Sequence, residues 1–203
     1  MKLLFSIVIA AALWFLMFSP WTVHLVNFWL TMSVSAVILI LLSAYLGKNF
    51  RKQFSFNGKD VCIGIVSAAV LWGVFYIGDW LSTLMFNFAK PQVSLIYGMK
   101  EGENPLALAI LLLLLIGPAE ELFWRGFIQR KFSEKFGAWI AFFATAAIYA
   151  LVHIWSFNFM LVMAALVCGG FWGLLYKWNK NILTLVISHA LWDVAVFVVF
   201  PIM

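Results

Sequence analysis

Charged side chains are scarce in this sequence. Of its 203 residues only 10% are charged, as 13 Lys or Arg and 8 Asp or Glu. A soluble globular domain carries about 25% charged residues, because it has a large hydrated surface to cover. Disorder is excluded too, since it requires low hydrophobicity and high net charge, whereas 66% of this chain is hydrophobic. The composition therefore predicts an integral membrane protein.

Cysteine is also rare, and the sequence contains no internal repeat and no low-complexity linker. Cys62 and Cys168 both fall inside apolar stretches, so nothing indicates a disulfide framework or a cysteine-based metal site. A chain of this length without a linker is expected to form a single membrane domain over residues 1–203. The net charge of +5 is a signal of membrane topology, which leaves nucleic-acid binding without support.

Long apolar stretches are what the sequence has in abundance. A membrane-spanning α-helix needs about 20 mostly apolar residues. Seven stretches qualify, at residues 3–19, 25–47, 61–79, 105–129, 138–155, 159–178 and 182–200. None alternates like a transmembrane β-strand. The predicted fold class is an all-α polytopic helical bundle, in which residues 1–19 are a retained first helix and residues 80–104 an interfacial segment.

The basic residues gather on one side of this arrangement. Ten of them precede the first span or occupy the loops after the second, fourth and sixth spans: Lys2, Lys48, Arg51, Lys52, Lys59, Arg130, Lys131, Lys135, Lys177 and Lys180. The other side holds Lys90 and Lys100. Because cytoplasmic loops are enriched in Lys and Arg, we predict a cytoplasmic N-terminus and an outward C-terminus. The short loops favour a bacterial cytoplasmic membrane.

Ionisable side chains inside the predicted spans are candidates for a functional site, because a lipid-exposed charge costs about 2.5–3.5 kcal/mol even on mild scales. The apolar run 105–119 has 15 residues and is too short to cross, so its helix must continue through Glu120, Glu121 and Arg125. Glu121 and Arg125, at i, i+4, can pair on one face, which leaves Glu120 free. An interfacial Glu–Arg pair is the structural alternative, but it does not explain a second carboxylate.

Two further pairs at i, i+4 spacing lie on later spans. Tyr149 and His153 are near the end of the fifth span, and His189 and Asp193 are deep in the seventh. Their structural alternatives are an interfacial histidine and a His–Asp pair that joins two helices. Together with the two glutamates and the arginine, they supply a base, groups for an oxyanion and orienting partners. Neither H-E-x-x-H nor G-x-S-x-G occurs, so a common zinc-protease helix and a serine nucleophile are not indicated.

The order of these motifs resembles a known family. Glu120-Glu121-x-x-x-Arg125-Gly126, Tyr149-x-x-x-His153 and His189-x-x-x-Asp193 occur on successive apolar segments. This pattern is similar to that of the CPBP (Abi) intramembrane proteases, which include type II CAAX prenyl endopeptidases and bacteriocin self-immunity proteins. The resemblance covers residues 105–200, the expected catalytic core. It implies an intramembrane endopeptidase that acts on a membrane-embedded or lipidated peptide.

The resemblance also implies two sets of site residues. Those expected to be catalytic are Glu120, His153, His189 and Asp193. Those expected to support them are Glu121, Arg125 and Tyr149. In this family pattern the first motif glutamate activates water with help from the first histidine, and the last motif stabilises the oxyanion.

Two positions depart from the family pattern. Tyr149 stands where the family usually has phenylalanine, and Asp193 where the eukaryotic enzymes have asparagine. An ionised carboxylate cannot donate a hydrogen bond to an oxyanion. Asp193 must therefore carry a proton or act by orienting His189.

The metal dependence of the site is open at this stage. Glu120, His153, His189 and Asp193 could serve as zinc ligands, because zinc accepts nitrogen and oxygen donors of these types. We favour a site without a cofactor, because a Glu–His pair suffices for general-base catalysis.

The depths of the candidate residues in the membrane disagree. Counting about 1.5 Å per residue places Glu120 roughly 15 Å from the basic side and His153 roughly 27 Å from it. Either the fifth helix is tilted, or it starts from an interfacial segment, or the predicted ends of the spans are wrong.

A non-enzymatic function is the alternative to proteolysis. Buried carboxylates and histidines also relay protons in carriers, and a bacteriocin-immunity protein could use them to bind a toxin or a receptor. Against a carrier, the sequence shows no inverted repeat with corresponding broken helices. The leading hypothesis is an intramembrane protease whose cavity faces the basic side.

Overall fold

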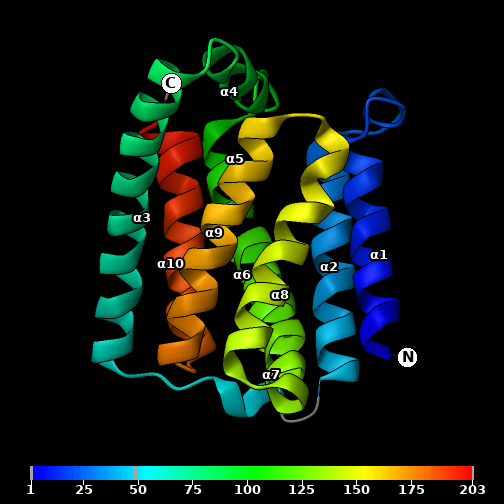
Figure 1. Cartoon of the computed structure of the whole chain (residues 1–203), viewed down its shortest axis with the longest axis vertical. Helices are drawn as coiled ribbons and strands as arrows, with labels where there is room; N and C mark the ends of the chain where they lie inside the picture. The colour runs from blue at the N-terminus through cyan, green and yellow to red at the C-terminus, as the bar shows by residue number, and fades with distance from the viewer. Residues whose placement is uncertain (1, 48–49, 203) are drawn as a thin grey trace.

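The chain folds into a bundle of helices joined by short connections (Figure 1). The structure, a computed structural model, describes residues 2–47 and 50–202, and every element in these ranges is helical. The α-helices are α1 (Lys2–Phe18), α2 (Phe28–Leu46), α3 (Gly58–Met85), α4 (Ala89–Gly98), α5 (Pro105–Leu111), α6 (Gly117–Phe123), α7 (Arg130–Phe136), α8 (Ala138–Leu151), α9 (Phe159–Trp178) and α10 (Ile182–Val194). Short 3₁₀ turns lie at Val23–Leu25, Phe50–Gln53 and Val152–Ser156. The all-α prediction is confirmed.

Apolar helices occur at all seven predicted spans. Six helical segments are long and apolar enough to cross a membrane: Phe28–Leu46, Gly58–Met85, Pro105–Phe136, Ala138–Ser156, Phe159–Trp178 and Ile182–Val199. The shorter apolar helix α1 has 17 residues. The chain is therefore an integral multi-pass membrane protein, while the number of crossings and their orientation stay predictions.

The N-terminus, α7, the start of α3 and the turn from α9 to α10 lie at one end of the bundle, and the C-terminus and α4 lie at the other (Figure 1). The predicted basic loops thus meet at one end, which we call the basic end. Lys48, one of the ten basic residues, lies outside the described residues. The predicted segment 80–104 contains the last turn of α3 and the short helix α4.

Asparagine side chains begin many of the helices. An asparagine at the N-cap accepts a hydrogen bond from an otherwise unpaired backbone N–H of the first turn, which stabilises the helix start. The caps that do this belong to α2, α3, α5, α9 and α10: Asn27, Asn57, Asn104, Asn158 and Asn181. These polar residues at the ends of apolar runs fix where the helices start.

The fourth span is a single long helix with two wider turns. It continues from α5 to α7, with π-helical turns at Leu112–Ile116 and Trp124–Gln129 on either side of α6. Pro118 lacks a backbone N–H, which disturbs the regular hydrogen-bond ladder next to the first of these turns. The helix ends at Gly137, whose φ of +86° suits a residue without a side chain.

This length corrects the predicted end of the span at residue 129 and removes the disagreement in depth. Counting about 1.5 Å per residue, Glu120 lies roughly 24 Å from the end of α7 at Phe136. His153 lies roughly 22 Å from the start of α8 at Ala138 by the same count. The two residues therefore reach the same level of the bundle.

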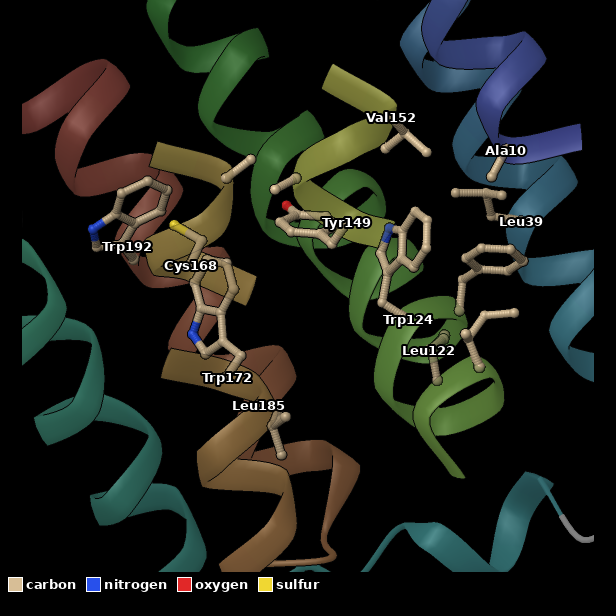
Figure 2. Close-up of a cluster of buried hydrophobic side chains, with 14 of the residues drawn as sticks. Ala10, Leu39, Leu122, Trp124, Tyr149, Val152, Cys168, Trp172, Leu185 and Trp192 are labelled. Carbon is tan, nitrogen blue, oxygen red and sulfur yellow. The ribbon is translucent and has the colours of Figure 1, made fainter. Parts of the chain in front are cut away.

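The helix α6 forms the centre of the bundle. It packs against α2 and α10, and α8 packs along α9. Most residues of α6 are buried, and so are those of the π-helical turn that follows it. Large side chains fill the space around it: Trp14, Trp124 and Trp172 are each no more than 1% exposed. Figure 2 shows Trp124, Tyr149 and Trp172 together inside the bundle.

A glycine lets α6 approach α10 closely. A Cβ at Gly117 would lie 3.0 Å from the backbone N and Cα of Ala190, and backbone cannot give way as a flexible side chain can. We expect Gly117→Ala to lower stability by about 1–3 kcal/mol, the usual cost of overpacking, and to move α6 away from α10. The measurement is the midpoint of unfolding in mild detergent.

Gly170 provides the matched control, because a Cβ there meets nothing within 4 Å. Gly170→Ala should be neutral or stabilising by up to about 1 kcal/mol, since alanine favours a helix over glycine. Equal effects of the two substitutions would contradict the close approach of α6 and α10.

Candidate active site

The two glutamates and the arginine of the first motif are buried at the centre of the bundle. Glu120 is 5% exposed, and Glu121 and Arg125 are fully buried. Glu121 lies one turn before Arg125, and the Arg125 guanidinium Nη1 donates a 2.7 Å hydrogen bond to Glu121 Oε1. The predicted i, i+4 pair is confirmed, and burial excludes the alternative of an interfacial pair.

Arg125 also connects the π-helical turn after α6 to α9. Its Nη2 lies 3.3 Å from the carbonyl oxygens of both Cys168 and Gly169. The guanidinium lies over the rings of Tyr149 and Trp172, at 5.0 and 5.5 Å from their centroids. Arg125 therefore supports the site from the side of the basic end and does not line the cavity.

Glu121 joins the first motif to the third. Its Oε1 is 2.7 Å from His189 Nδ1, so this carboxylate oxygen accepts from both the arginine and the histidine. A carboxylate bound to Nδ1 fixes the orientation of the imidazole and directs Nε2 elsewhere. The His189 ring is also stacked on Trp172, with ring centroids 3.7 Å apart.

His189 Nε2 faces the carboxyl group of Asp193. Its distance to Asp193 Oδ2 is 3.5 Å, longer than a normal hydrogen bond. The predicted i, i+4 pair thus shares a face of α10, with both side chains buried. Ser188 points to another part of the core, where its Oγ accepts from Ser67 and from Trp172 Nε1.

Glu120 is hydrogen-bonded to Tyr149, one of the two residues that depart from the family pattern. Tyr149 Oη donates a 2.6 Å hydrogen bond to Glu120 Oε2. The extra hydroxyl therefore contacts the candidate base directly. Glu120 Oε1 makes no hydrogen bond to a described residue, and Glu120 lines the cavity.

His153 is engaged at both ring nitrogens. Trp14 Nε1 donates a 2.9 Å hydrogen bond to His153 Nε2, and His153 Nδ1 lies 2.7 Å from the carbonyl oxygen of Tyr149. This arrangement requires the neutral tautomer with its proton on Nδ1. Trp14, in the helix α1, was absent from the sequence-based candidates, because no spacing along the chain connects it to His153.

One cavity of about 510 Å³ joins these groups. Its polar lining near the centre of the bundle comes from Glu120, Tyr149, His153, His189 and Asp193. All four residues predicted to be catalytic therefore border the same space. Most of the remaining lining is apolar or aromatic, and the volume is that of a typical ligand pocket.

The cavity was predicted to face the basic side, and this prediction is wrong. It extends from the polar groups toward the end that carries α4, where Ser82, Phe86, Tyr97 and Phe159 line it. Toward the basic end the interior is closed by packed side chains, among them the fully buried Trp172 and Ile128. The basic loops of the described chain contribute nothing to the lining.

The candidate zinc ligands border one cavity, but they are not arranged as a metal-binding group among the described residues. A zinc site needs at least three protein ligands in tetrahedral geometry, and the described residues contain no group of three His, Cys, Asp or Glu side chains that could hold a metal ion. Glu120 is bound by Tyr149, and His153 by Trp14. As they are arranged, these residues do not fit zinc. Cys62 and Cys168 are both free.

Comparison with known proteins finds one family that the C-terminal half of the chain resembles. The model of the family described as type II CAAX prenyl endopeptidase Rce1-like matches residues 102–195. No curated protein and no solved structure gives a significant match to the chain. The matched segment contains all three motifs and every helix between α5 and α10. Residues 102–195 thus match the Rce1-like type II CAAX prenyl endopeptidases, the group that the motif pattern resembles.

Proposed function

We propose that the protein is an intramembrane endopeptidase that hydrolyses a peptide bond in a membrane-anchored substrate. The observation that carries the proposal is the convergence of Glu120, His153, His189 and Asp193 on one largely apolar cavity. The family match supports a protease of the CAAX type. Because the family is named for CAAX prenyl endopeptidases, a prenylated peptide is the first substrate to test. The proposed location is a bacterial cytoplasmic membrane.

Glu120 is the proposed general base. Glu120 lines the cavity, and its Oε2 accepts the hydrogen bond from the Tyr149 hydroxyl. The carboxylate takes one proton from a water molecule as the water oxygen bonds to the carbonyl carbon of the substrate. When the C–N bond breaks, the same proton passes to the leaving amine, so the carboxylate is regenerated.

His189 and Asp193 are the proposed oxyanion side of the site. With Nδ1 bound to Glu121, His189 turns Nε2 toward Asp193 and the cavity. A proton held between Nε2 and the Asp193 carboxyl can form a hydrogen bond to the carbonyl oxygen as that oxygen gains negative charge, and it stays on the His189–Asp193 pair when the C–N bond breaks and the carbonyl re-forms. This arrangement favours a role for Asp193 in orienting and sharing a proton with His189.

In this proposal His153 Nε2 accepts a hydrogen bond from the water molecule. Nε2 has a single lone pair, so it can do this only when the hydrogen bond from Trp14 Nε1 is broken. We therefore expect Trp14→Phe, which keeps an aromatic ring and removes the N–H, to raise kcat/KM roughly fivefold. This corresponds to about 1 kcal/mol for one competing hydrogen bond. The measurement is peptide cleavage per folded protein.

Trp178→Phe is the control for Trp14→Phe, because Trp178 is 71% exposed and lies at the end of α9. It should leave cleavage unchanged. A fall in kcat/KM for Trp14→Phe, with an unchanged unfolding midpoint, would contradict a direct role of His153 in binding water.

The proposed reaction is tested with purified protein and a quenched fluorescent farnesylated CAAX peptide, with products identified by mass spectrometry. We expect cleavage at one internal peptide bond, and its loss in both Glu120→Ala and His189→Ala. Cleavage that survives both substitutions would refute the proposed site. Metal analysis of the active protein decides between the glutamate and zinc alternatives, and about one zinc per chain that is needed for activity would refute the former.

A non-enzymatic immunity or carrier function is the competing hypothesis. It predicts that protection or transport survives Glu120→Gln, which preserves shape and removes the base. The apolar lining of the cavity and the family match both favour the protease.

A further inference from the structure

One acidic side chain that lines the cavity has no part in the proposed reaction. Asp79, on α3, borders the cavity together with Ser82 and Phe86 of the same helix. Because these three residues follow one another at spacings of three and four, they share one face of α3. The carboxyl group of Asp79 therefore borders the same space as Glu120.

Asp79 lies further toward the end with α4 than the proposed base does. Counting about 1.5 Å per residue, Asp79 lies roughly 32 Å from the start of α3 at Gly58, and Glu120 roughly 24 Å from the end of α7. Both of these reference points lie at the basic end (Figure 1). The difference of roughly 8 Å corresponds to about two or three residues of an extended peptide.

No described residue neutralises the carboxylate of Asp79. Its side chain makes no hydrogen bond or ion pair within residues 2–47 and 50–202, and only its backbone carbonyl accepts from Ser82 Oγ, at 3.0 Å. Two lysines belong to this end of the bundle. Lys100 Nζ donates a 2.6 Å hydrogen bond to the carbonyl oxygen of Phe197, and Lys90 is exposed at the start of α4.

The other acidic groups of the cavity have partners inside it. Glu120 accepts a hydrogen bond from Tyr149. Asp193 faces His189. Within the described chain neither lysine nor arginine lines the cavity, so nothing there balances the charge of Asp79. A carboxylate without a partner in an apolar space is costly, and ionisable side chains on membrane helices usually pair or mark the path of a substrate.

Aromatic side chains line the part of the cavity next to Asp79. Phe86, Tyr97 and Phe197 border it there, and the rings of Tyr97 and Phe197 lie 5.8 Å apart. Burial raises the pKa of the Tyr97 hydroxyl, and the negative charge of Asp79 adds to this effect, so the two groups are close enough to interact. A carboxylate beside aromatic rings offers an ammonium or guanidinium group both an ion pair and cation–π contacts.

We propose that Asp79 determines the specificity of the site by binding a positively charged residue of the substrate. The ligand is a lysine or arginine side chain of the membrane-anchored peptide, about two or three residues from the bond that is cleaved at Glu120. A peptide with a carboxylate at that position is disfavoured, because two negative charges then meet in an apolar space. This inference rests on the proposed function, because it names the class of peptide that the same site prefers.

The test uses farnesylated CAAX peptides that differ at one position. Lysine, its uncharged analogue norleucine, and glutamate are placed in turn at each position within about three residues of the cleaved bond. At one position we expect kcat/KM for the lysine peptide to exceed that for the norleucine peptide about fivefold, the equivalent of about 1 kcal/mol for a partly exposed ion pair. In Asp79→Asn this preference for lysine should disappear.

Glu101→Gln is the matched control. It also removes one negative charge from the end with α4, but Glu101 is exposed and does not line the cavity. It should keep both the rate of cleavage and the preference for lysine. Asp79→Asn keeps the shape of the side chain and removes no hydrogen bond that the described carboxylate makes. Asp79→Lys should reverse the preference, so that the glutamate peptide is cleaved faster than the lysine peptide at the same position.

The outcomes separate this inference from the function on which it rests. If the unsubstituted protein cleaves none of the peptides, the proposed function fails and the inference fails with it. If it cleaves them without preferring lysine at any position, or if Asp79→Asn keeps the preference, only the role of Asp79 is refuted. An equal loss of the preference in Glu101→Gln also refutes it, because the effect would then come from the overall charge at that end. Where Asp79→Lys yields little folded protein, the ratio measured in Asp79→Asn decides.

Discussion

Replacement of Glu120 by glutamine is expected to reduce peptide cleavage about 10³-fold, within the range observed when a general base is removed. The amide oxygen of glutamine can still accept the hydrogen bond that Tyr149 Oη donates to Glu120 Oε2. The side chain therefore keeps its shape and its partner, and loses the ability to take a proton from water. The measurement is kcat/KM for the farnesylated peptide, together with the unfolding midpoint.

Glu103→Gln is the control for this substitution, because Glu103 is an exposed residue of the loop before α5. It should cleave at the rate of the unsubstituted protein. If Glu120→Gln retained more than about a third of the activity with a normal midpoint, Glu120 would not be the base. Persistence of a toxin-protection phenotype in Glu120→Gln would instead support the immunity hypothesis.

The sequence was most informative where the chemistry depends on neighbours along one helix. The Glu121–Arg125 and His189–Asp193 pairs were predicted from i, i+4 spacing alone, and the structure places them on shared faces. Apolar length likewise placed the membrane helices. Both signals are local, so a single sequence contains them.

Contacts between helices distant in sequence were not predictable in the same way. Trp14 and His153 are separated by most of the chain, and only the packing of α1 beside the 3₁₀ turn after α8 brings them together. The hydrogen bond from Tyr149 to Glu120 has the same origin. Side-chain spacing has no information about which helix faces which, and this is why Trp14 was missed.

The direction of the cavity was mispredicted for a related reason. The distribution of charge indicates which loops lie on the same side of the membrane. It does not indicate where the packing of side chains leaves a cavity. The basic end is filled because Arg125, Trp172 and Gln129 pack there, with Gln129 Nε2 donating to the carbonyl oxygen of Gly173 at 2.8 Å. The space is left on the other side of Glu120, where the lining consists mainly of α3, α4 and α9.

Removal of the buried cation should have the largest effect on stability. Arg125→Met keeps much of the side-chain volume, but leaves Glu121 fully buried without its arginine partner. Breaking a buried ion pair by removing one partner costs about 3–5 kcal/mol. The hydrogen bonds to the carbonyl oxygens of Cys168 and Gly169 are lost as well. We expect a strongly lowered unfolding midpoint in mild detergent and little folded protein in the membrane.

The chain contains its own control for this substitution. Lys131 and Glu134 form an i, i+3 pair with a 2.6 Å contact, in which the side chains are 26% and 49% exposed. Because exposed pairs contribute about 0.2–1 kcal/mol, Lys131→Met should change the midpoint slightly. The double variant Glu121→Gln with Arg125→Met should recover stability relative to Arg125→Met, since the buried negative charge is then gone. If Arg125→Met and Lys131→Met were equally mild, or the double variant recovered nothing, the charge of Glu121 without its arginine partner would not be what destabilises the bundle.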